Sequence, residues 1–153
     1  MVGRRCHRNT AGGARAFIAD YVVVNDVTMR DLARPDTLVL GKSGLGHGPF
    51  GPWLTTADAV TDPHALAIHT WVNGELRQSL TTAELHVGCF DLLAWLSSVL
   101  VLEPGTVIAT GSPAGSEAGF TPPRWLVPGD VVRVAIEGLG AIEHRVVAEA
   151  PGL

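Results

Sequence analysis

The sequence predicts an α+β fold that is mostly β. About six segments have the residue pattern of β-strands and two or three that of short helices, without the regular alternation of folds built from βαβ units. A length of 153 residues is that of one ordinary domain, and 46% hydrophobic with 17% charged residues is typical of a globular protein. We therefore expect a single domain over residues 1–153.

The N-terminal third is predicted to hold one helix, one strand and a long loop. Residues 10–20 are predicted to be helical because their apolar side chains recur on one side, with Thr10 as a candidate N-cap. The segment YVVVNDV at 21–27 is rich in β-branched residues and is predicted to be a strand. Residues 41–52 contain several glycines and two prolines, which predicts an irregular loop whose backbone can approach another group closely.

The rest of the chain is predicted to contain a hairpin, a helix and further strands. Apolar and polar residues alternate over 66–72 and over 75–80, and Asn73-Gly74 between them is a preferred turn sequence for a β-hairpin. Leucine and valine at helical spacing predict an amphipathic helix over 87–101, which the following proline and glycine end. Further strands are predicted at 106–110, 131–137 and 141–148.

The composition argues against several classes of partner. A net charge of −4 without a basic cluster predicts no nucleic-acid partner, because neutralising phosphates requires clustered Lys and Arg. No apolar run reaches the roughly 18 to 20 residues of a membrane span, so no membrane segment is expected. Cys6 and Cys89 have no metal-binding or redox spacing, which favours two reduced thiols and a cytoplasmic protein.

The chain's single lysine, Lys42, lies in a Gly-Lys-Ser triplet within a glycine-rich run. A nucleotide-binding loop of the Walker type requires glycine five residues before the Gly-Lys pair, where this sequence has Asp36. It also requires a helix to start at the lysine, which the glycines and proline that follow do not allow. We therefore expect Lys42 to serve another purpose.

Polar side chains follow strands at two further places. Asp26 comes directly after an apolar strand, where a carboxylate is costly unless a cation or hydrogen-bond donors receive it. The alternative is a capped turn in which Arg30 and Asp31 form a surface ion pair. Ser112 follows a predicted strand between glycine and Pro-Ala-Gly, and its alternative role is that of a plain turn residue.

Five motifs in order resemble the fumarylacetoacetate hydrolase family. They are NDVTMRD, LGKSGLGHGPFGPWL, DPHALAIHTWVNGELRQ, LEPGTVIATGSPAG and LVPGDVVRVAIEGLGAI, and the match runs over about residues 2–147. The resemblance implies a β-roll, usually as a homodimer. It also implies an enzyme with Mg²⁺ or Mn²⁺ as cofactor that hydrolyses, isomerises or decarboxylates small 2-oxo or β-dicarbonyl acids, of the acylpyruvate or 2-hydroxyhepta-2,4-diene-1,7-dioate type used in aromatic compound catabolism. The metal would stabilise an enolate.

The resemblance also implies roles for individual residues. Asp26 matches the family's aspartate metal ligand, and Arg30 and Asp31 match a pair that supports the site around the metal. Lys42 matches the active-site lysine beside the metal. Ser112 matches the hydroxyl that contacts the substrate carboxylate.

The sequence departs from the family pattern at two places. The opening MVGRRC resembles the segment that follows the family's Glu-x-Glu metal ligands, so we expect the catalytic domain to be truncated at its N-terminus and its ligand set to be incomplete. The chain is then either part of a working enzyme or a catalytically inactive remnant, such as a dimerisation module. In the glycine loop, His47 is either a proton donor near Lys42 or a solvent-facing histidine, and the other histidines have no ligand-like spacing.

Overall fold

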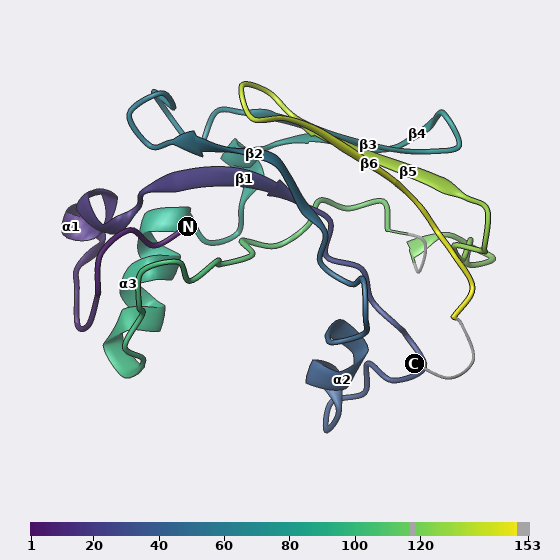
Figure 1. Ribbon diagram of the computed structural model, residues 1–153, viewed down its shortest axis with the longest axis horizontal. Coiled ribbons are helices and arrows are strands. Elements are labelled where there is room, and N and C mark those ends of the chain that lie inside the picture. The colour runs from purple at the N-terminus through teal and green to yellow at the C-terminus, as the bar shows by residue number, and fades with distance from the viewer. Residues whose placement is uncertain (117–118, 150–153) are drawn as a thin grey trace.

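The computed structural model describes residues 1–116 and 119–149, and it confirms the mostly β, α+β class. A four-stranded sheet has the order β4-β3-β5-β6, and a two-stranded sheet pairs β1 with β2 (Figure 1). All described strand pairs are antiparallel. The strands are β1 (Asp20–Val24), β2 (Phe50–Thr56), β3 (Ala67–Val72), β4 (Glu75–Thr81), β5 (Val131–Ile136) and β6 (Gly140–Arg145).

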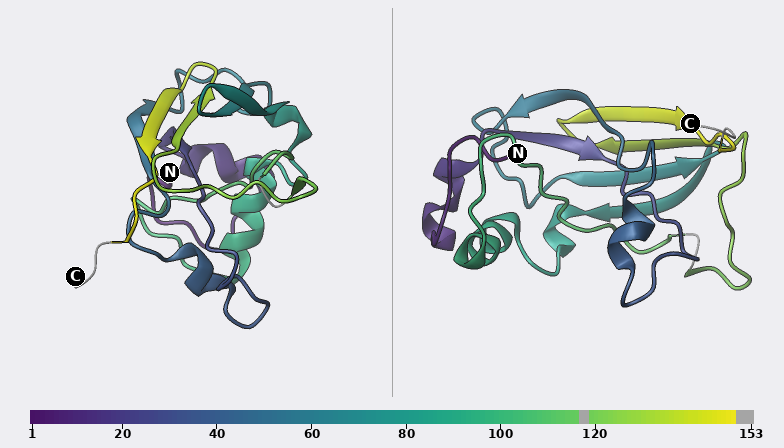
Figure 2. Two further views of the ribbon diagram at one scale, coloured as in Figure 1. Left: turned by 90° about the vertical axis from the view of Figure 1, so that its right-hand side faces the viewer. Right: turned by 60° about the horizontal axis from the view of Figure 1, so that its bottom comes forward.

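In the described part of the chain, short α-helices and 3₁₀ turns accompany the sheets. They are α1 (Ala11–Ala14), η1 (Arg15–Phe17), α2 (Leu38–Lys42), η2 (Thr82–Glu84) and α3 (Cys89–Val99). α1 packs against α3 at one end of the molecule, whereas α2 lies on the same side of the sheets as α3 but well apart from it (Figure 2). None of the helices in the described part of the chain is long and apolar enough to cross a membrane.

The hairpin predicted around Asn73-Gly74 is confirmed as β3 and β4. Asn73 and Gly74 both have positive φ, 52° and 81°, which is the backbone conformation that a two-residue hairpin turn of type I′ requires. The Asn73 side chain also reaches the next strand. Its Nδ2 donates to Asp130 Oδ1 at 2.8 Å, and its Oδ1 accepts from the Val131 amide at 2.9 Å. The turn thus ties β3 to β5 as well as to β4.

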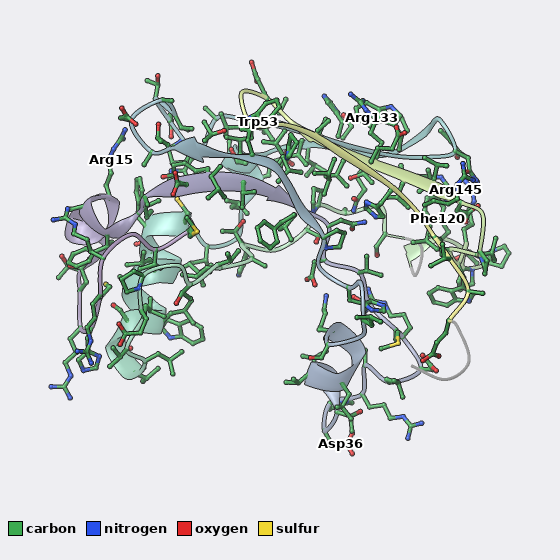
Figure 3. All side chains as sticks on the ribbon, viewed as in Figure 1. Arg15, Asp36, Trp53, Phe120, Arg133 and Arg145 are labelled. Carbon is green, nitrogen blue, oxygen red and sulfur yellow. The ribbon has the colours of Figure 1, made fainter. Side chains whose placement is uncertain are left out.

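Two clusters of buried apolar residues hold the fold together. The first joins the two sheets and consists of Val23, Val60, Val72, Val132, Val134 and Leu139. The second lies between the N-terminal segment and α3 and consists of Val2, Cys6, Ala14, Leu93 and Leu102. The sheets also meet where the Trp53 ring of β2 approaches Gly140 of β6, because a Cβ at position 140 would lie 2.8 Å from the ring (Figure 3).

Two of the predicted elements are wrong in part, and the strand predicted at 106–110 is wrong altogether. The helix predicted over 10–20 is confined to α1 and η1, and Thr10 makes no side-chain cap bond. Residues 106–110 form no strand, although their segment runs beside the N-terminus, where the Val2 amide donates to Thr106 O at 2.9 Å. The predicted loop 41–52 begins with the last residues of α2 and ends with the first residues of β2. β2 contains Pro52, which is tolerated because β2 pairs with β1 alone.

Candidate active site

All six side chains singled out in the sequence line one cavity. It has a volume of about 1060 Å³, and its wall includes Asp26, Arg30, Asp31, Lys42, His47 and Ser112. The first three come from the loop after β1, Lys42 from the end of α2, His47 from the glycine loop, and Ser112 from the long connection between α3 and β5. The fold thus brings together residues from four separate segments.

The shortest polar contact in this cavity joins Lys42 to Asp26. Lys42 Nζ donates to Asp26 Oδ2 at 2.6 Å, and each side chain is only about a third exposed, 37% and 35%. Lys42 is therefore the cation that balances the Asp26 carboxylate at the end of the apolar strand. The alternative in which Arg30 and Asp31 form a surface ion pair is not what the structure shows, because neither side chain makes an ion pair with a described residue.

Backbone contacts explain why Lys42 reaches Asp26. The Asn25 amide donates to Pro49 O at 3.0 Å, and the Met29 amide donates to Gly41 O at 2.9 Å, so the loop after β1 is bound to both ends of the segment that carries Lys42. Gly41 is buried against Ala33, and a Cβ at position 41 would lie 2.7 Å from the Ala33 Cβ. Glycine is therefore needed at this position for α2 to approach the loop. Asp36 lies at the far tip of this segment, away from the sheets (Figure 3).

The remaining predicted residues differ in how firmly they are held. Arg30, Asp31 and Ser112 are exposed on the cavity wall. The Ser112 segment is anchored by Gln78, whose Nε2 donates to Pro113 O at 2.8 Å. His47 is half-buried rather than solvent-facing, because its ring packs against Gly44. Its Nδ1 is buried without a hydrogen-bond partner among the described residues.

A histidine of this cavity was not predicted from the sequence to have a role. His144 of β6 accepts a hydrogen bond at Nε2 from Asn25 Nδ2 at 2.8 Å, and burial lowers the pKa of His144 below its usual value. Asn25 immediately precedes Asp26, so this bond fixes the backbone from which the Asp26 carboxylate projects. No spacing in the sequence joins positions 25 and 144, and the contact arises only because β6 lies beside the end of β1.

The described residues do not by themselves fit a divalent cation. Within residues 1–116 and 119–149, no group of three or more His, Cys, Asp or Glu side chains is arranged to hold a metal ion. Asp26 Oδ2 is already engaged by the Lys42 ammonium. Mg²⁺ requires about six well-placed oxygen ligands, which one carboxylate paired to a lysine does not supply.

Comparison with known families gives a clear result. The model of the family described as "Fumarylacetoacetate (FAA) hydrolase C-terminal" matches residues 1–147. The chain belongs to the fumarylacetoacetate hydrolase family. The resemblance stated from the five sequence motifs is therefore confirmed, and so is the fold that it implied.

Relatives within the fumarylacetoacetate hydrolase family include enzymes and solved structures. A bifunctional isomerase/decarboxylase of 4-hydroxyphenylacetate degradation from Salmonella dublin is 38% identical over 97% of this chain and 34% of its own length. A fumarylacetoacetate hydrolase from Exiguobacterium antarcticum superimposes with a TM-score of 0.93 at 41% identity, over 97% of this chain and 54% of that one. The chain thus spans about a third to a half of these relatives.

A third relative was solved with ligands. Maleylpyruvate hydrolase from Sphingobium sp. SYK-6, in complex with manganese(II) and pyruvate, superimposes with a TM-score of 0.84 at 33% identity, over 96% of this chain and 51% of that one. Use of a divalent metal therefore occurs in the fumarylacetoacetate hydrolase family.

Proposed function

We propose that this chain forms part of the active site of an enzyme that hydrolyses, isomerises or decarboxylates 2-oxo or β-dicarbonyl acids. The observation that carries the proposal is the Lys42–Asp26 pair, which lies in the wall of a large cavity together with Ser112 and Arg30. The isomerase/decarboxylase relative and the relative solved with pyruvate, itself a 2-oxo acid, support the substrate class. On this proposal, residues 1–153 belong to one catalytic domain.

The cavity offers groups suited to an anionic substrate. The Ser112 hydroxyl would donate a hydrogen bond to the substrate carboxylate, and the exposed Arg30 guanidinium would add a positive charge beside it. When a bond to carbon breaks next to a carbonyl, negative charge develops on the carbonyl oxygen. The Lys42 ammonium would stabilise that charge from a partly buried position, where an ionic interaction is stronger than in water. His47 would be the proton donor for the resulting carbanion.

We also propose that Mg²⁺ or Mn²⁺ acts in the complete site. Asp26 would supply one ligand, and further carboxylates from outside the described residues would supply the others. Asp31, which lies on the same cavity wall as Asp26, would support the loop that carries Asp26. A homodimer in the cytoplasm is proposed on the family resemblance alone.

A second candidate function is a dimerisation module without catalysis. The observation that favours it is the exposed apolar surface of α3. Trp95 and Val99, which lie four positions apart on α3, are 69% and 76% exposed. Exposed apolar side chains that gather into a patch mark interaction surfaces.

One experiment separates the two functions. The purified chain is assayed with oxaloacetate and with an acylpyruvate at a Mn²⁺ concentration high enough to occupy a weak site, together with Lys42→Met and Ser112→Ala. Arg5→Met is the control, because Arg5 belongs to an exposed ion pair with Glu103 outside the cavity. We expect Lys42→Met to lower kcat/KM by roughly 100-fold or more, and Arg5→Met to leave it unchanged. Activity that survives Lys42→Met would overturn the proposal. A folded dimer without activity towards either substrate would favour the dimerisation module.

A further inference from the structure

A thiol, an imidazole and a carboxylate lie in a row outside the large cavity. Cys89 is the first residue of α3, and its Sγ lies 3.3 Å from His64 Nε2. On the other side of the ring, His64 Nδ1 lies 3.6 Å from Asp62 Oδ1. Asp62 is itself fixed, because Oδ1 accepts a hydrogen bond from the His64 amide at 2.9 Å. A nucleophile next to a base that a third group orients is the arrangement of nucleophilic protein sites.

The hydrogen bonds determine which ring nitrogen is the base. The Cys89 backbone amide donates to His64 Nε2 at 3.0 Å, so Nε2 carries the lone pair and the proton of the neutral ring is on Nδ1, which faces Asp62. The edge of the Phe90 ring packs against the imidazole, with centroids 5.0 Å apart and planes at 85°. Nε2 therefore faces the first residue of α3, where it accepts from the Cys89 amide and lies beside the Cys89 thiol.

The thiol faces a cavity rather than solid protein. Cys89 lines a cavity of about 140 Å³ whose wall also includes Tyr21, Leu66 and Leu85, and which adjoins the large cavity at Asp26. Burial raises the pKa of the Cys89 thiol and raises that of Tyr21 to about 12, so both groups are neutral at pH 7. The neighbouring Tyr21 hydroxyl acts in the opposite direction on the pKa of Cys89 and favours a thiolate when one forms. A thiol of this kind reacts well only when a base removes its proton, and His64 is the base in contact with it.

We propose that Cys89, His64 and Asp62 form a nucleophilic site that adds to small α,β-unsaturated carbonyl compounds. This proposal does not depend on the function proposed for the large cavity. The thiol proton passes to His64 Nε2, and Sγ forms a bond to the β-carbon of the ligand. The electrons of the C=C bond move through the α-carbon to the carbonyl oxygen as an enolate. The proton then returns from the imidazolium, which Asp62 stabilises, to the α-carbon. Every atom of thiol and ligand is kept, and no oxidant is needed.

Two simpler roles account for only part of this arrangement. His64 Nε2 also caps α3 through the Cys89 amide, because Gly88 at the N-cap has no side chain to do so. A cap does not require a carboxylate behind the ring or a thiol facing a cavity. A metal site of three ligands is not formed here either, since no such group occurs in the described ranges.

The test is the rate of alkylation of the folded chain by acrylamide, followed by peptide mass mapping. Cys6 is fully buried and serves as the internal control for folding. We expect Cys89 to be modified and Cys6 to be spared. His64→Gln keeps a side-chain acceptor for the Cys89 amide but removes the base, and we expect it to lower the rate at Cys89 by about tenfold or more at pH 7. His86→Gln, at an exposed position shortly before α3, is the matched control with an unchanged rate.

The pH profile distinguishes a base from a structural residue. In His64→Gln the rate should depend more steeply on pH than in the wild-type chain, because without the base only a thiol that has already ionised can react. Asp62→Asn retains the imidazole but removes the carboxylate behind it, and it should lower the rate at Cys89 at pH 7. This variant keeps the test available if His64→Gln fails to fold. An unmodified Cys89, or an unchanged rate and profile in His64→Gln and Asp62→Asn, would overturn the proposal.

Discussion

Lys42 Nζ lies 2.6 Å from Asp26 Oδ2, although 16 positions separate the two residues in the chain. The contact depends on two loops that are bound to each other by backbone hydrogen bonds and on a glycine that lets α2 approach. Because both side chains are about a third exposed, the attraction is screened by water and contributes little to stability, on the order of 0–1 kcal/mol. The pair thus lies where a change affects chemistry more than folding.

We predict that Lys42→Met changes the free energy of unfolding by less than about 1 kcal/mol. Urea denaturation followed by tryptophan fluorescence measures this difference. Arg5→Met removes the exposed ion pair with Glu103 and should have an effect of similar size. A loss of several kcal/mol in Lys42→Met alone would mean that the pair supports the fold rather than a reaction.

Binding of Mn²⁺ to the 153-residue chain should be weak, with a dissociation constant on the order of 1 mM or more. The physical reason is that Asp26 is a single carboxylate already paired to an ammonium, whereas tight sites provide several oxygen ligands. Titration calorimetry of the chain and of Asp26→Ala tests this expectation. Micromolar binding that Asp26→Ala abolishes would contradict it and would show that the described residues form a metal site after all.

Gly41→Ala should destabilise the protein by about 1–3 kcal/mol and separate Lys42 from Asp26. The added methyl group would meet the backbone of Ala33 at 2.9 Å, so α2 would have to move. The matched control is Gly12→Ala in α1, where nothing lies within 4 Å and alanine should be neutral or stabilising by up to about 1 kcal/mol. Thermal melts of both variants suffice, and equal melting temperatures would refute the role assigned to Gly41.

Asn73→Ala should destabilise the protein more than Asn73→Gly does. Both changes remove the hydrogen bonds to Asp130 and Val131, but only alanine is strained at a φ of 52°, by roughly 1–2 kcal/mol. The difference in free energy of unfolding between the two variants isolates the backbone contribution of the turn. If the two variants were equally stable, the side-chain bonds alone would explain the choice of asparagine.

Stability should fall as the pH falls below about 6.5, the usual histidine pKa, and His144 should contribute to this fall. Burial lowers the pKa of folded His144 below its unfolded value, so between the two values the unfolded chain binds more protons. The contribution is thus fully present above the unfolded pKa and is lost as the pH falls through the folded pKa. Denaturation between pH 5 and 8 should show a flatter profile for His144→Asn than for the exposed control His86→Asn. If stability depended on pH in the same way in both variants, His144 would not contribute to the loss of stability at low pH.

Elements with local signals were predicted well from the sequence. The hairpin predicted at 66–72 and 75–80 is found at Ala67–Val72 and Glu75–Thr81, because its turn chemistry and its alternation lie within adjacent residues. The helix predicted at 87–101 is found at Cys89–Val99 for the same reason. The last two strands, predicted from residues 131 and 141, begin at Val131 and Gly140.

Elements that depend on distant partners were missed. β2 contains two residues that disfavour strands, Gly51 and Pro52, and becomes a strand only by pairing with β1. Residues 106–110 have a strand-like pattern but run along the N-terminal segment without forming a ladder. The contacts of Asn25 with His144 and of His64 with Cys89 could not be predicted from the sequence. Each joins two segments that come together only in the folded protein.

The hydrogen bonds of the Asn73 side chain join segments that come together at different stages of folding. β3 meets β4 across a turn of two residues, so this hairpin can form within microseconds. β3 meets β5 only after residues 73–130 have been closed into a loop, and closing a longer loop costs more chain entropy and slows folding. Asn73 sits where that loop closes, since its side chain holds Asp130 and Val131. Formation of the β3–β5 pair is therefore expected to limit the folding rate. Ser112 lies within the loop that this pairing closes, so its segment is expected to take its final path only at that step.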